Sequence, residues 1–532
     1  MSPEWVHPGL VLIAGAWRET LAPGASFRAV NPASRSRLDE VYPVSSLAEL
    51  EQALVAAEEA IVELRDDSTD RIADFLEGYA EGIEARTEEL VTTAHLETAL
   101  AREPRLRSVE LPRTTDQLRQ AAAAARDRSW RHATIDTQRN IRSRYGPLGG
   151  AVVIFGPNNF PFAFNAISGG DFAAAIAAGN AVIAKAHPSH PGTTRILAEA
   201  AYEALQRSGL PLSLVQMFYH TEPENGLRLV AHPLVKTVAF TGSRPAGLRL
   251  KEAADKAGKP IYLEMSSINP VFILPGALAE RPEAIADDFL GSCTLAAGQF
   301  CTNPGLVIVR QNKQSEAFLA AVGQRLNQVD AGVLFSEGGP RNLAQAIATW
   351  QAHGAQVVVG GHEVEAGGYG FANTLARVAG EAFLAHSRAL QSEAFGTASL
   401  FVLARDGSNM VAIAGALEGN LTASIYSGRQ GQDDALYDEL EPVLRPKVGR
   451  LLNDQMPTGV AVSPAMVHGG PYPATGHPGF TAVGIPASLL RFAALHGYDN
   501  VRPERLPLEL QDANPTGRMW RFIDGAWTQR DA

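Results

Sequence analysis

Cys301 is the residue whose type and surroundings first suggest chemistry in this chain. It lies in "GQFCTNPG", residues 298–305, where a glycine before it and a proline after it suit a loop that exposes the sulfur. A thiolate is a strong nucleophile, and positive dipoles nearby lower its pKa. Without further motifs, a small buried cysteine would be the commoner interpretation. We keep that interpretation for Cys293, in the more apolar "FLGSCTLAAG".

The elements that must position such chemistry are short apolar runs that alternate with amphipathic helical segments from residue 145 onward. Apolar runs of four to six residues, each followed by a helix, predict a parallel sheet covered on both faces. The pattern therefore indicates an α/β fold with a doubly wound sheet. The runs are "GGAVVIF", "NAVIAK", "SLVQMF", "VKTVAF" and "IYLEM".

Three polar turns follow these runs, in "FGPNNFP", "KAHPSHPG" and "FTGS". Ligands of such sheets bind at the carboxyl ends of the strands, so we expect the three turns to converge on one edge. Lys185 ends its strand and can reach a ribose or a phosphate there, although it could also be a solvated lysine. The chain has no GxGxxG fingerprint, so the fold prediction rests on the strand-helix alternation.

Helices precede this region and a second α/β set follows it. A strand pair in "LVLIAGAW" and "FRAVNP" comes before a helix for which Ser46 and Glu49 predict a capping box. The second set of apolar runs begins near "NPVFILPGAL" and continues through "GLVIVR", "AQVVVG" and "ASLFVL", which places a domain boundary close to residue 266. A Gly/Pro-rich stretch then leads to a C-terminal segment that could pack against another subunit.

Composition excludes several classes of partner. The net charge is −11 and the basic residues are scattered among acids, so we expect no nucleic acid and no anionic membrane. Two cysteines cannot form a disulfide framework, and the first residues, "MSPEW", have no leader pattern. We therefore expect the cytoplasm.

No metal site is expected either. Cys293 and Cys301 lack the paired spacing of zinc ligands. His187 and His190 stand close together, but the prolines that follow each of them and the absence of a nearby carboxylate favour a turn.

Five segments in order make the chain similar to a known family. They are "GPNNFPFAFNAISGGDFAAAIAAGNAVIAK", "VAFTGS", "YLEMSSINP", "GQFCTNPG" and "SEAFG". From about residue 10 to residue 490 the chain resembles the aldehyde dehydrogenase superfamily. The resemblance implies a dinucleotide-binding domain at 1–125 and 145–265 and a catalytic domain at 266–484. It also implies a homo-dimer or homo-tetramer formed through a hairpin at 126–144 and a C-terminal arm at 485–532.

The resemblance also implies catalytic roles. Cys301 would be the thiolate that attacks an aldehyde, and Asn159 would hold the developing oxyanion together with the Cys301 backbone N–H. Glu264 would activate the water that hydrolyses the thioester. This chain has Ser266 and Ser267 where the family has two glycines, and Asn158 where the family usually has tryptophan.

For the cofactor, the resemblance implies contacts from Lys185 to the adenosine ribose, from Ser243 to the pyrophosphate, and from Glu393 with Phe395 to the nicotinamide ribose. Further cofactor contacts are expected at Pro157, Gly242 and His187. The acid that selects NAD in the family is absent, because the chain reads Ala186-His187-Pro188 after the lysine. Without a carboxylate to repel a 2′-phosphate, we expect NADP to be preferred, or NAD and NADP both to be used.

The substrate is expected to be a small-molecule aldehyde. The departures from the family pattern resemble the branch of 2,5-dioxopentanoate (α-ketoglutaric semialdehyde) dehydrogenases, with NADP-dependent fatty-aldehyde enzymes as the alternative. Substrate contacts are predicted for Phe162, Phe300, Asn303 and His468, the last in "HGGPYPATGHPG". That segment could equally be a connecting turn, and Phe162 could be plain core.

Three other functions stay open at this point. Cys301 with His468 could form a thiol-base pair of a cysteine hydrolase. The chain could be a non-catalytic protein on a dehydrogenase scaffold, although a scaffold alone requires none of the polar side chains named above. A coenzyme A-acylating relative is disfavoured because Glu264 is present where a base for water is wanted.

Overall fold

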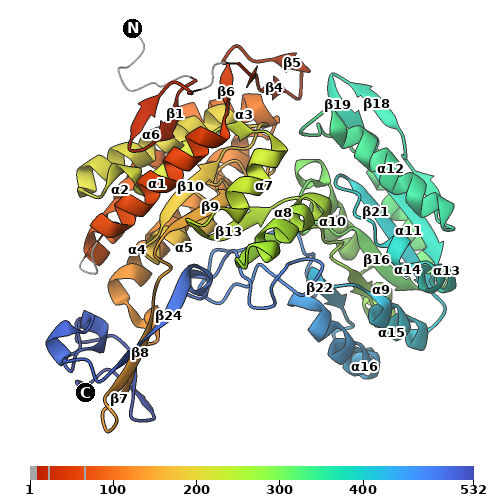
Figure 1. Ribbon diagram of the computed structural model, residues 1–532. Coiled ribbons are helices and arrows are strands. Elements are labelled where there is room, and N and C mark those ends of the chain that lie inside the picture. The colour runs from red at the N-terminus through yellow and green to blue at the C-terminus, as the bar shows by residue number, and fades with distance from the viewer. Residues whose placement is uncertain (1–8, 22–23, 65–67) are drawn as a thin grey trace.

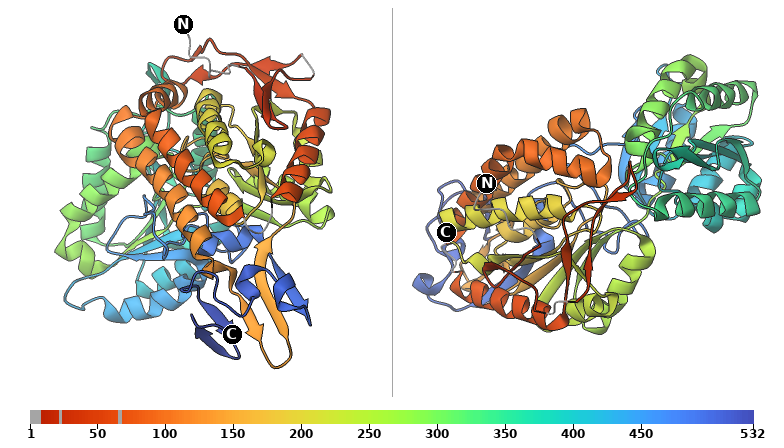
Figure 2. Two further views of the ribbon diagram at one scale, coloured as in Figure 1. Left: turned by 90° about the vertical axis from the view of Figure 1, so that its left-hand side faces the viewer. Right: turned by 90° about the horizontal axis from the view of Figure 1, so that it is seen from above.

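The structure, a computed structural model, is described for residues 9–21, 24–64 and 68–532. The N-terminal segment on which the leader argument depends lies outside the described residues. Two lobes, each built around a seven-stranded sheet, stand side by side, and a third sheet projects below them (Figure 1). The view from above in Figure 2 separates the two lobes clearly.

The first sheet has the order β14-β13-β9-β10-β11-β1-β2. Its first five strands are parallel, and each is one of the predicted apolar runs, so the α/β prediction is confirmed. Two antiparallel strands, β1 and β2, join the edge, and both come from the predicted run "LVLIAGAW". The prediction that this run pairs with "FRAVNP" is wrong, because residues 26–31 form β3 and β4, which belong to separate small sheets. The strands are β9 (Ala151–Phe155), β10 (Ala181–Lys185), β11 (Val215–Phe218), β13 (Val235–Thr241), β14 (Ile261–Glu264), β1 (Val11–Ile13) and β2 (Ala16–Arg18).

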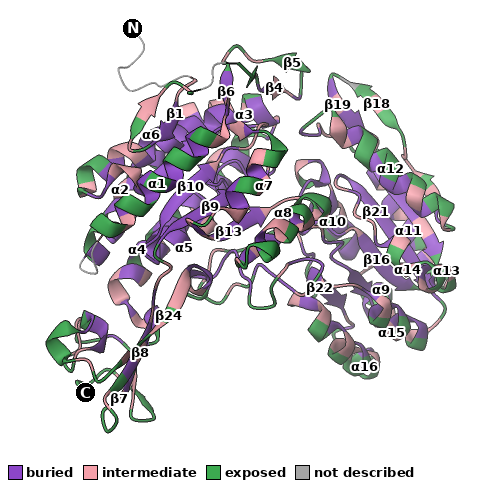
Figure 3. Cartoon of the chain, in the orientation of Figure 1, coloured by how far each residue is buried: buried purple, intermediate pink, exposed green. Residues whose placement is uncertain are grey.

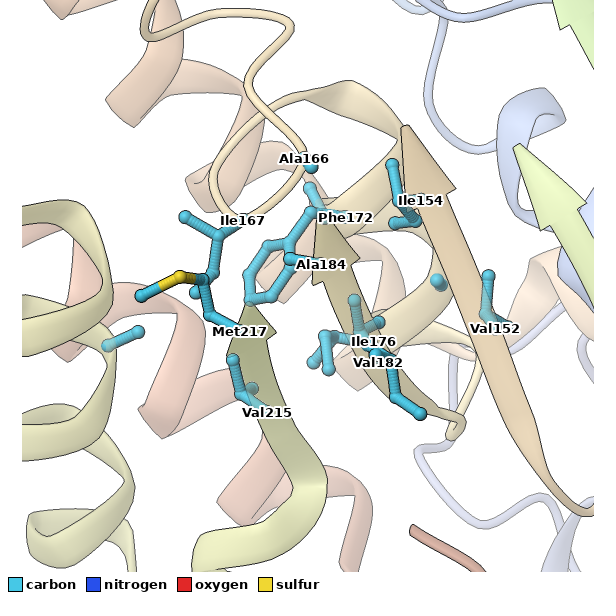
Figure 4. Packing of buried hydrophobic residues seen from close by; sticks show 14 of the residues in the cluster. Val152, Ile154, Ala166, Ile167, Phe172, Ile176, Val182, Ala184, Val215 and Met217 are labelled. Carbon is cyan, nitrogen blue, oxygen red and sulfur yellow. The ribbon is translucent and has the colours of Figure 1, made fainter. Parts of the chain in front are cut away.

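The core of this lobe forms where α5 crosses the sheet (Figure 4). Phe172 and Ile176 are four residues apart on α5 and so share one helix face. They pack on alternate residues of three strands, which project from one face of the sheet. Those residues are Val152 and Ile154 on β9, Val182 and Ala184 on β10, and Val215 and Met217 on β11.

Helices cover both faces of the first sheet, as Figures 1 and 3 show. They are α1 (Leu47–Glu63), α2 (Thr69–Ala85), α3 (Thr87–Thr98), α4 (Leu111–Asp127), α5 (Gly170–Ala177), α6 (Pro191–Ser208), α7 (Pro223–Ala231) and α8 (Arg244–Lys256). The buried sides of these helices face the sheet and their exposed sides face outward (Figure 3).

The predicted capping box of α1 is only half correct. Ser46 Oγ accepts a hydrogen bond from the Glu49 backbone N at 3.3 Å. The Glu49 carboxylate instead accepts from Thr20 Oγ1 at 3.0 Å and from the Leu21 backbone N at 3.3 Å. Glu49 therefore ties α1 to the segment after β2.

The second sheet has the order β17-β20-β21-β16-β15-β22-β23 and is parallel except for β17. It contains the four predicted strands and three that the sequence analysis did not identify, β20, β22 and β23. The strands are β15 (Val271–Ile273), β16 (Leu306–Arg310), β17 (Gln356–Val359), β20 (Thr374–Ala379), β21 (Ala398–Ala404), β22 (Asn420–Tyr426) and β23 (Val448–Asn453). Its helices are α9 (Pro275–Glu280), α10 (Pro282–Cys293), α11 (Lys313–Leu326), α12 (Gly338–Ala352), α13 (Gly380–Ala385), α14 (Ser387–Leu390), α15 (Gly407–Ala416) and α16 (Asp434–Leu444).

The third sheet contains the predicted hairpin, with β7 (Thr134–Asp136) and β8 (Ile141–Pro147). β24 (Ala493–Asp499) pairs with β8, while β25 (Arg521–Ile523) pairs with β7 and β26 (Ala526–Thr528) lies outermost. The C-terminal arm thus returns to the hairpin of its own chain, as the left view of Figure 2 shows. Shorter strands are β3 (Ser26–Phe27), β4 (Val30–Asn31), β5 (Ser36–Arg37), β6 (Tyr42–Ser45), β12 (His220–Thr221), β18 (Glu363–Ala366) and β19 (Gly368–Phe371).

Within the described residues, no helix has both the length and the apolar composition needed to cross a membrane.

Candidate active site

The carboxyl ends of the central strands of the first sheet meet at one edge. Lys185 is in register with Phe155 on the neighbouring strand, and Glu264 is in register with Thr241. The three predicted polar turns follow these positions and therefore share the edge. Glu264 also forms an isolated antiparallel bridge with Thr475, which brings the 468–479 segment against the end of β14.

Cys301, His468 and Glu264 converge at this edge. His468 Nε2 lies 3.5 Å from Cys301 Sγ and 2.9 Å from Glu264 Oε1. The Cys301 sulfur, one His468 ring nitrogen and one Glu264 carboxylate oxygen lie within 4.8 Å of one another. His468 and Glu264 are almost completely buried, and Cys301 keeps part of its surface exposed. The second Glu264 oxygen, Oε2, is buried and has no hydrogen-bond partner among the described residues. It is therefore a free acceptor beside the sulfur.

The position of one proton links the three side chains. Burial and the neighbouring Glu264 carboxylate raise the pKa of the Cys301 thiol well above its usual range, and Arg113 offsets this in part. His468 Nε2 carries either one hydrogen or one lone pair. It can accept the thiol proton from Cys301 or donate a hydrogen bond to Glu264, but a neutral imidazole cannot do both through this atom. The imidazole is thus placed to move a proton away from the sulfur.

The same donor set could in chemical terms chelate a divalent cation, since it offers one sulfur, one nitrogen and one oxygen. The expectation that the chemistry needs no metal stays a prediction. Elemental analysis of the purified, active protein would check it.

The Cys301 loop has a constrained backbone. Ala296, Ala297 and Gly298 all have positive φ, at 49°, 56° and 70°. A Cβ at Gly298 would lie 2.3 Å from the Gly396 backbone, so this position requires glycine. Cys293, at the end of α10, is buried as predicted.

Asn269 holds the loop from the other side. Its Nδ2 donates to the Cys301 carbonyl at 2.8 Å and to the Asn303 carbonyl at 2.9 Å. Its Oδ1 accepts from Ser267 Oγ at 2.9 Å and from Thr422 Oγ1 at 3.0 Å. The Asn269 amide therefore links the backbone of the Cys301 loop to the side chains of Ser267 and Thr422.

Asn159 is buried next to the same loop. Its Nδ2 donates to the Gln299 carbonyl at 3.0 Å, which leaves the second N–H of the amide available. The Asn159 backbone carbonyl accepts a hydrogen bond from Arg105 Nη2 at 3.0 Å. Arg105 also forms a buried ion pair with Glu110. Glu110 Oε1 accepts from the backbone N of Phe162 and of the following alanine. The Asn159 turn is thus fixed at both ends.

A crevice of about 600 Å³ opens beside this cluster and brings three predicted cofactor residues together. Ser243, Glu393 and Phe395 all lie on its wall. Burial raises the pKa of Glu393 to about 7, and its Oε1 accepts from the Ser267 backbone N at 3.3 Å. Ser266 also hydrogen-bonds to Glu393. Ser266 therefore holds this carboxyl through its side chain, and Ser267 holds it through a backbone N–H that a glycine would also provide.

Lys185 stands at the end of β10 apart from that crevice, and burial lowers its pKa to about 8. His187 Nδ1 accepts from the Ser189 backbone N at 3.1 Å, and its ring stacks on His190 at 5.4 Å. Burial and the neighbouring His190 lower the pKa of His187 well below its usual range. His190 Nε2 hydrogen-bonds to the Pro157 carbonyl at 2.9 Å, which fits the predicted turn.

Gly242 occupies the turn after β13. Its backbone N donates to the Glu264 carbonyl at 3.0 Å, and a Cβ there would lie 2.7 Å from the Phe240 ring. The turn therefore brings the chain close to the strand that carries Glu264.

A second cavity, of about 1070 Å³, is lined by residues of the Cys301 loop. Phe300 lies on its wall as expected, and the Phe160 ring packs against it at 5.2 Å. The prediction for Phe162 is wrong, because its side chain is fully buried in the core of the first lobe. The turn at 161–164 directs Phe160 and Phe164 toward this cavity's end and Phe162 away from it.

The prediction that Asn303 contacts the substrate is also wrong, because Asn303 does not line the large cavity. It lines a small space of about 10 Å³ together with Glu393 and Phe395. Its Nδ2 donates to the Gly396 carbonyl at 3.3 Å, because the chain turns back after Cys301. It therefore does not line the large cavity.

The sequence analysis missed three residues of this site: Asn269, Phe160 and Arg113. Asn269 lies in the quoted segment "YLEMSSINP" and Phe160 in "GPNNFP", so both were within a recognised pattern. Arg113 had no such signal, since it begins an alanine-rich helix with ordinary amphipathic spacing. His468, for which a substrate contact is predicted, hydrogen-bonds to Cys301 and Glu264 and does not line the large cavity.

Comparisons with known proteins identify the family of the chain. The sequence profile of the aldehyde dehydrogenase family matches residues 17–442. The chain is 39% identical to α-ketoglutaric semialdehyde dehydrogenase 2 of Azospirillum brasilense, over 92% of this chain and 94% of that protein. It is 34% identical to α-ketoglutaric semialdehyde dehydrogenase of Acinetobacter baylyi, over 92% and 93%.

Solved structures show the same fold. Lactaldehyde dehydrogenase from Escherichia coli superposes with a TM-score of 0.79 at 23% identity, over 92% of this chain and 98% of that one. PnpE in complex with nicotinamide adenine dinucleotide also superposes with a TM-score of 0.79, at 20% identity, over 93% and 98%.

Proposed function

The chain belongs to the aldehyde dehydrogenase family and is an NAD(P)-dependent enzyme, and from this premise we propose that it oxidises a semialdehyde such as 2,5-dioxopentanoate to the dicarboxylate. The observation that carries the proposed chemistry is the Cys301–His468–Glu264 cluster at the sheet edge. The two relatives named for α-ketoglutaric semialdehyde support the substrate class.

In the proposed mechanism, His468 takes the thiol proton and the Cys301 sulfur attacks the aldehyde carbon. The free N–H of Asn159 and the Cys301 backbone N–H hold the oxyanion that forms on the former carbonyl oxygen. A bound oxidised nicotinamide would supply the hydride acceptor for that carbon, and loss of the hydride would leave a thioester on Cys301. Asn269 keeps the nucleophile's backbone fixed throughout.

Glu264 completes the reaction. Its unpartnered oxygen accepts a proton from the attacking water, the carbon–sulfur bond breaks, and the carboxylate product leaves. The thiolate is restored. Because a base for water stands beside the sulfur, we propose hydrolysis and not transfer to coenzyme A. A product that is a coenzyme A thioester would contradict this.

The residues present fit the cofactor. The N-terminus of α8 opens on the crevice at Ser243, where backbone N–H groups without helical partners suit a pyrophosphate. The buried carboxyl of Glu393 suits a ribose hydroxyl. We propose that residues 1–125 and 145–265 form the dinucleotide-binding domain and 266–484 the catalytic domain.

A substrate panel tests the proposed activity. The purified enzyme is assayed with 2,5-dioxopentanoate, pentanal and a long-chain aldehyde, each with NAD and with NADP. We expect the highest kcat/KM for 2,5-dioxopentanoate. A higher value for the long-chain aldehyde would favour the fatty-aldehyde alternative, and ester hydrolysis without nucleotide as the main activity would favour the cysteine hydrolase.

Substitution of His468 tests its role as proton acceptor. We expect His468→Gln to slow alkylation of Cys301 by iodoacetamide at neutral pH about tenfold, since a rise of one unit in the thiol pKa lowers the thiolate fraction by that factor. The acid limb of the kcat/KM profile should move to higher pH. The matched control is His477→Gln, an exposed histidine of the same segment. An unchanged alkylation rate in His468→Gln would exclude the proposed transfer.

We propose that NADP is preferred, because Lys185 is surrounded by histidines and the family's selector acid is absent. A lysine is charged below its pKa and neutral above it. With a pKa of about 8, Lys185 should lose its hold on a 2′-phosphate as pH rises through 8, so KM for NADP should increase while KM for NAD stays flat. Lys185→Arg should remove this dependence. A lower KM for NAD at every pH would contradict the preference.

We also propose a homo-dimer or homo-tetramer that forms through the third sheet. β24 is an edge strand of that sheet, and Leu495 on it is 62% exposed. Unpaired strand edges of this kind pair readily with another chain. A monomer mass by light scattering would contradict this proposal.

A further inference from the structure

Three arginines line the large cavity that leads to the nucleophile loop, although most of its wall is apolar. They are Arg105, Arg113 and Arg450. Apolar tunnels suit hydrocarbon chains, so positive charges here need a physical reason. The three arginines differ in whether they form an ion pair with an acidic side chain.

Arg105 is already neutralised. It forms a buried ion pair with Glu110 and donates to the Asn159 carbonyl. The other oxygen of Glu110 accepts two backbone N–H groups of the 161–164 turn. No hydrogen bond or ion pair joins Glu110 to Arg113 among the described residues, although the Glu110 charge raises the Arg113 pKa. Arg105 thus serves the turn and not a ligand.

Arg113 has no acid partner among the described residues. Its Nε and Nη2 atoms are buried and form no hydrogen bond there. The guanidinium lies over the rings of Phe164 at 5.0 Å and Phe160 at 5.6 Å. Burial lowers its pKa to about 10, so it is still charged at neutral pH. A buried charge without a counter-ion is costly unless something else pairs with it.

The guanidinium stands at the end of the cavity nearest the chemistry. Phe164, over which it lies, packs on the His468 ring at 5.5 Å. The charges of Glu110, Cys301 and Glu264 all raise the Arg113 pKa, which shows that Cys301 and Glu264 are near enough to act on it. An anionic group held by Arg113 would therefore lie within a short chain's length of the sulfur.

Arg450 provides a second positive charge on the cavity wall. Its Nη2 donates to the Gly459 carbonyl at 3.0 Å and to the Pro457 carbonyl at 3.4 Å, and it forms no ion pair with a described residue. The charge of Cys301 reaches Arg450 as well. Arg450 holds the 457–466 segment in place and adds positive potential.

We propose that Arg113 is the specificity residue that binds the distal carboxylate of the semialdehyde, with Arg450 as the supporting charge. This inference rests on the proposed function. A planar guanidinium can hold a carboxylate through two parallel hydrogen bonds. The aromatic rings beneath it keep it oriented and exclude water. A short substrate with a carboxylate at one end and an aldehyde at the other would then present its aldehyde carbon to Cys301.

The test compares a charged and a neutral substrate. Arg113→Met and Arg113→Lys are assayed with 2,5-dioxopentanoate and with pentanal, which has the same chain length and no carboxylate. We expect Arg113→Met to lower the ratio of kcat/KM for 2,5-dioxopentanoate to kcat/KM for pentanal roughly 10- to 100-fold, mainly through KM for 2,5-dioxopentanoate. Loss of the charge beside Cys301 lowers kcat/KM for both substrates alike and therefore cancels in this ratio. Arg113→Lys should lose less, because it keeps the charge. Arg450→Met should show a smaller effect of the same selectivity.

Arg119→Met is the matched control. Arg119 lies on the same helix, α4, but is exposed and pairs with Glu84 at 2.6 Å, so neither substrate should be affected. An equal loss for both substrates in Arg113→Met, or no loss, overturns the inference while the proposed function stands. Wild-type enzyme that prefers pentanal overturns both. If Arg113→Met does not fold, the selective loss in Arg113→Lys decides between these results.

Discussion

Replacement of Cys301 by serine is expected to lower aldehyde oxidation roughly 10⁴-fold or more, because the covalent step loses its nucleophile. A serine hydroxyl in the same place would have to lose its proton to His468 against a much higher pKa. The surrounding loop should persist, since Asn269 bonds to the backbone and not to the sulfur. The measurement is the rate of NAD(P)H formation at saturating aldehyde.

The control is already in the chain. Cys293→Ser removes the other thiol, which is buried at the end of α10 and whose pKa burial raises to about 12. It should leave the rate within a few-fold. If aldehyde oxidation survived in Cys301→Ser or disappeared in Cys293→Ser, the assignment of Cys301 as the nucleophile would be wrong.

Replacement of Glu264 by glutamine is expected to separate the two halves of the reaction. In the proposed mechanism, Glu264 accepts a proton only during hydrolysis of the thioester and not during its formation. Rapid mixing should show a burst of NAD(P)H close to one equivalent per site, followed by turnover slowed roughly 10²- to 10⁴-fold, the usual contribution of a general base. The isosteric amide keeps the hydrogen bond to His468 possible.

Glu252→Gln is a suitable control, because Glu252 is an exposed residue of α8 that pairs with Lys256. It should retain both the burst and the turnover rate. If Glu264→Gln abolished the burst as well, Glu264 would be required before or during hydride transfer, and the assignment to water would fail.

Much of the fold was predictable because its strands are short apolar runs that bury completely in a parallel sheet. β9, β10 and β13 are of this kind. The strands that escaped prediction carry polar residues. β22 contains Asn420 and Thr422, whose buried side chains hydrogen-bond to Ile268 and Asn269. Tertiary hydrogen bonds, which no local pattern records, make such residues acceptable in the core.

The site divides in the same way. Residues that end strands, such as Lys185 and Glu264, follow from the pattern of the sheet. The contact between Glu264 and His468 joins positions 204 residues apart, so only the fold reveals it. Arg113 shows the limit most clearly, since only the fold reveals that its buried guanidinium forms no ion pair with the described residues.

Two side-chain directions were also beyond local inference. Phe162 and Asn303 lie in tight turns, where neighbouring side chains point in very different directions. Phe162 enters the core and Asn303 turns toward Glu393. Neither direction follows from hydrophobic spacing, which applies only to regular helices and strands.

The most direct test of the covalent mechanism is the mass of the trapped intermediate. Glu264→Gln enzyme is mixed with 2,5-dioxopentanoate and NADP, quenched in acid and digested, and the peptide that contains residues 298–305 is analysed. The account predicts an adduct on Cys301 with the mass of the aldehyde less two hydrogens, which marks an oxidised thioester. An adduct on another residue, an unoxidised aldehyde adduct, or turnover without any adduct would contradict it.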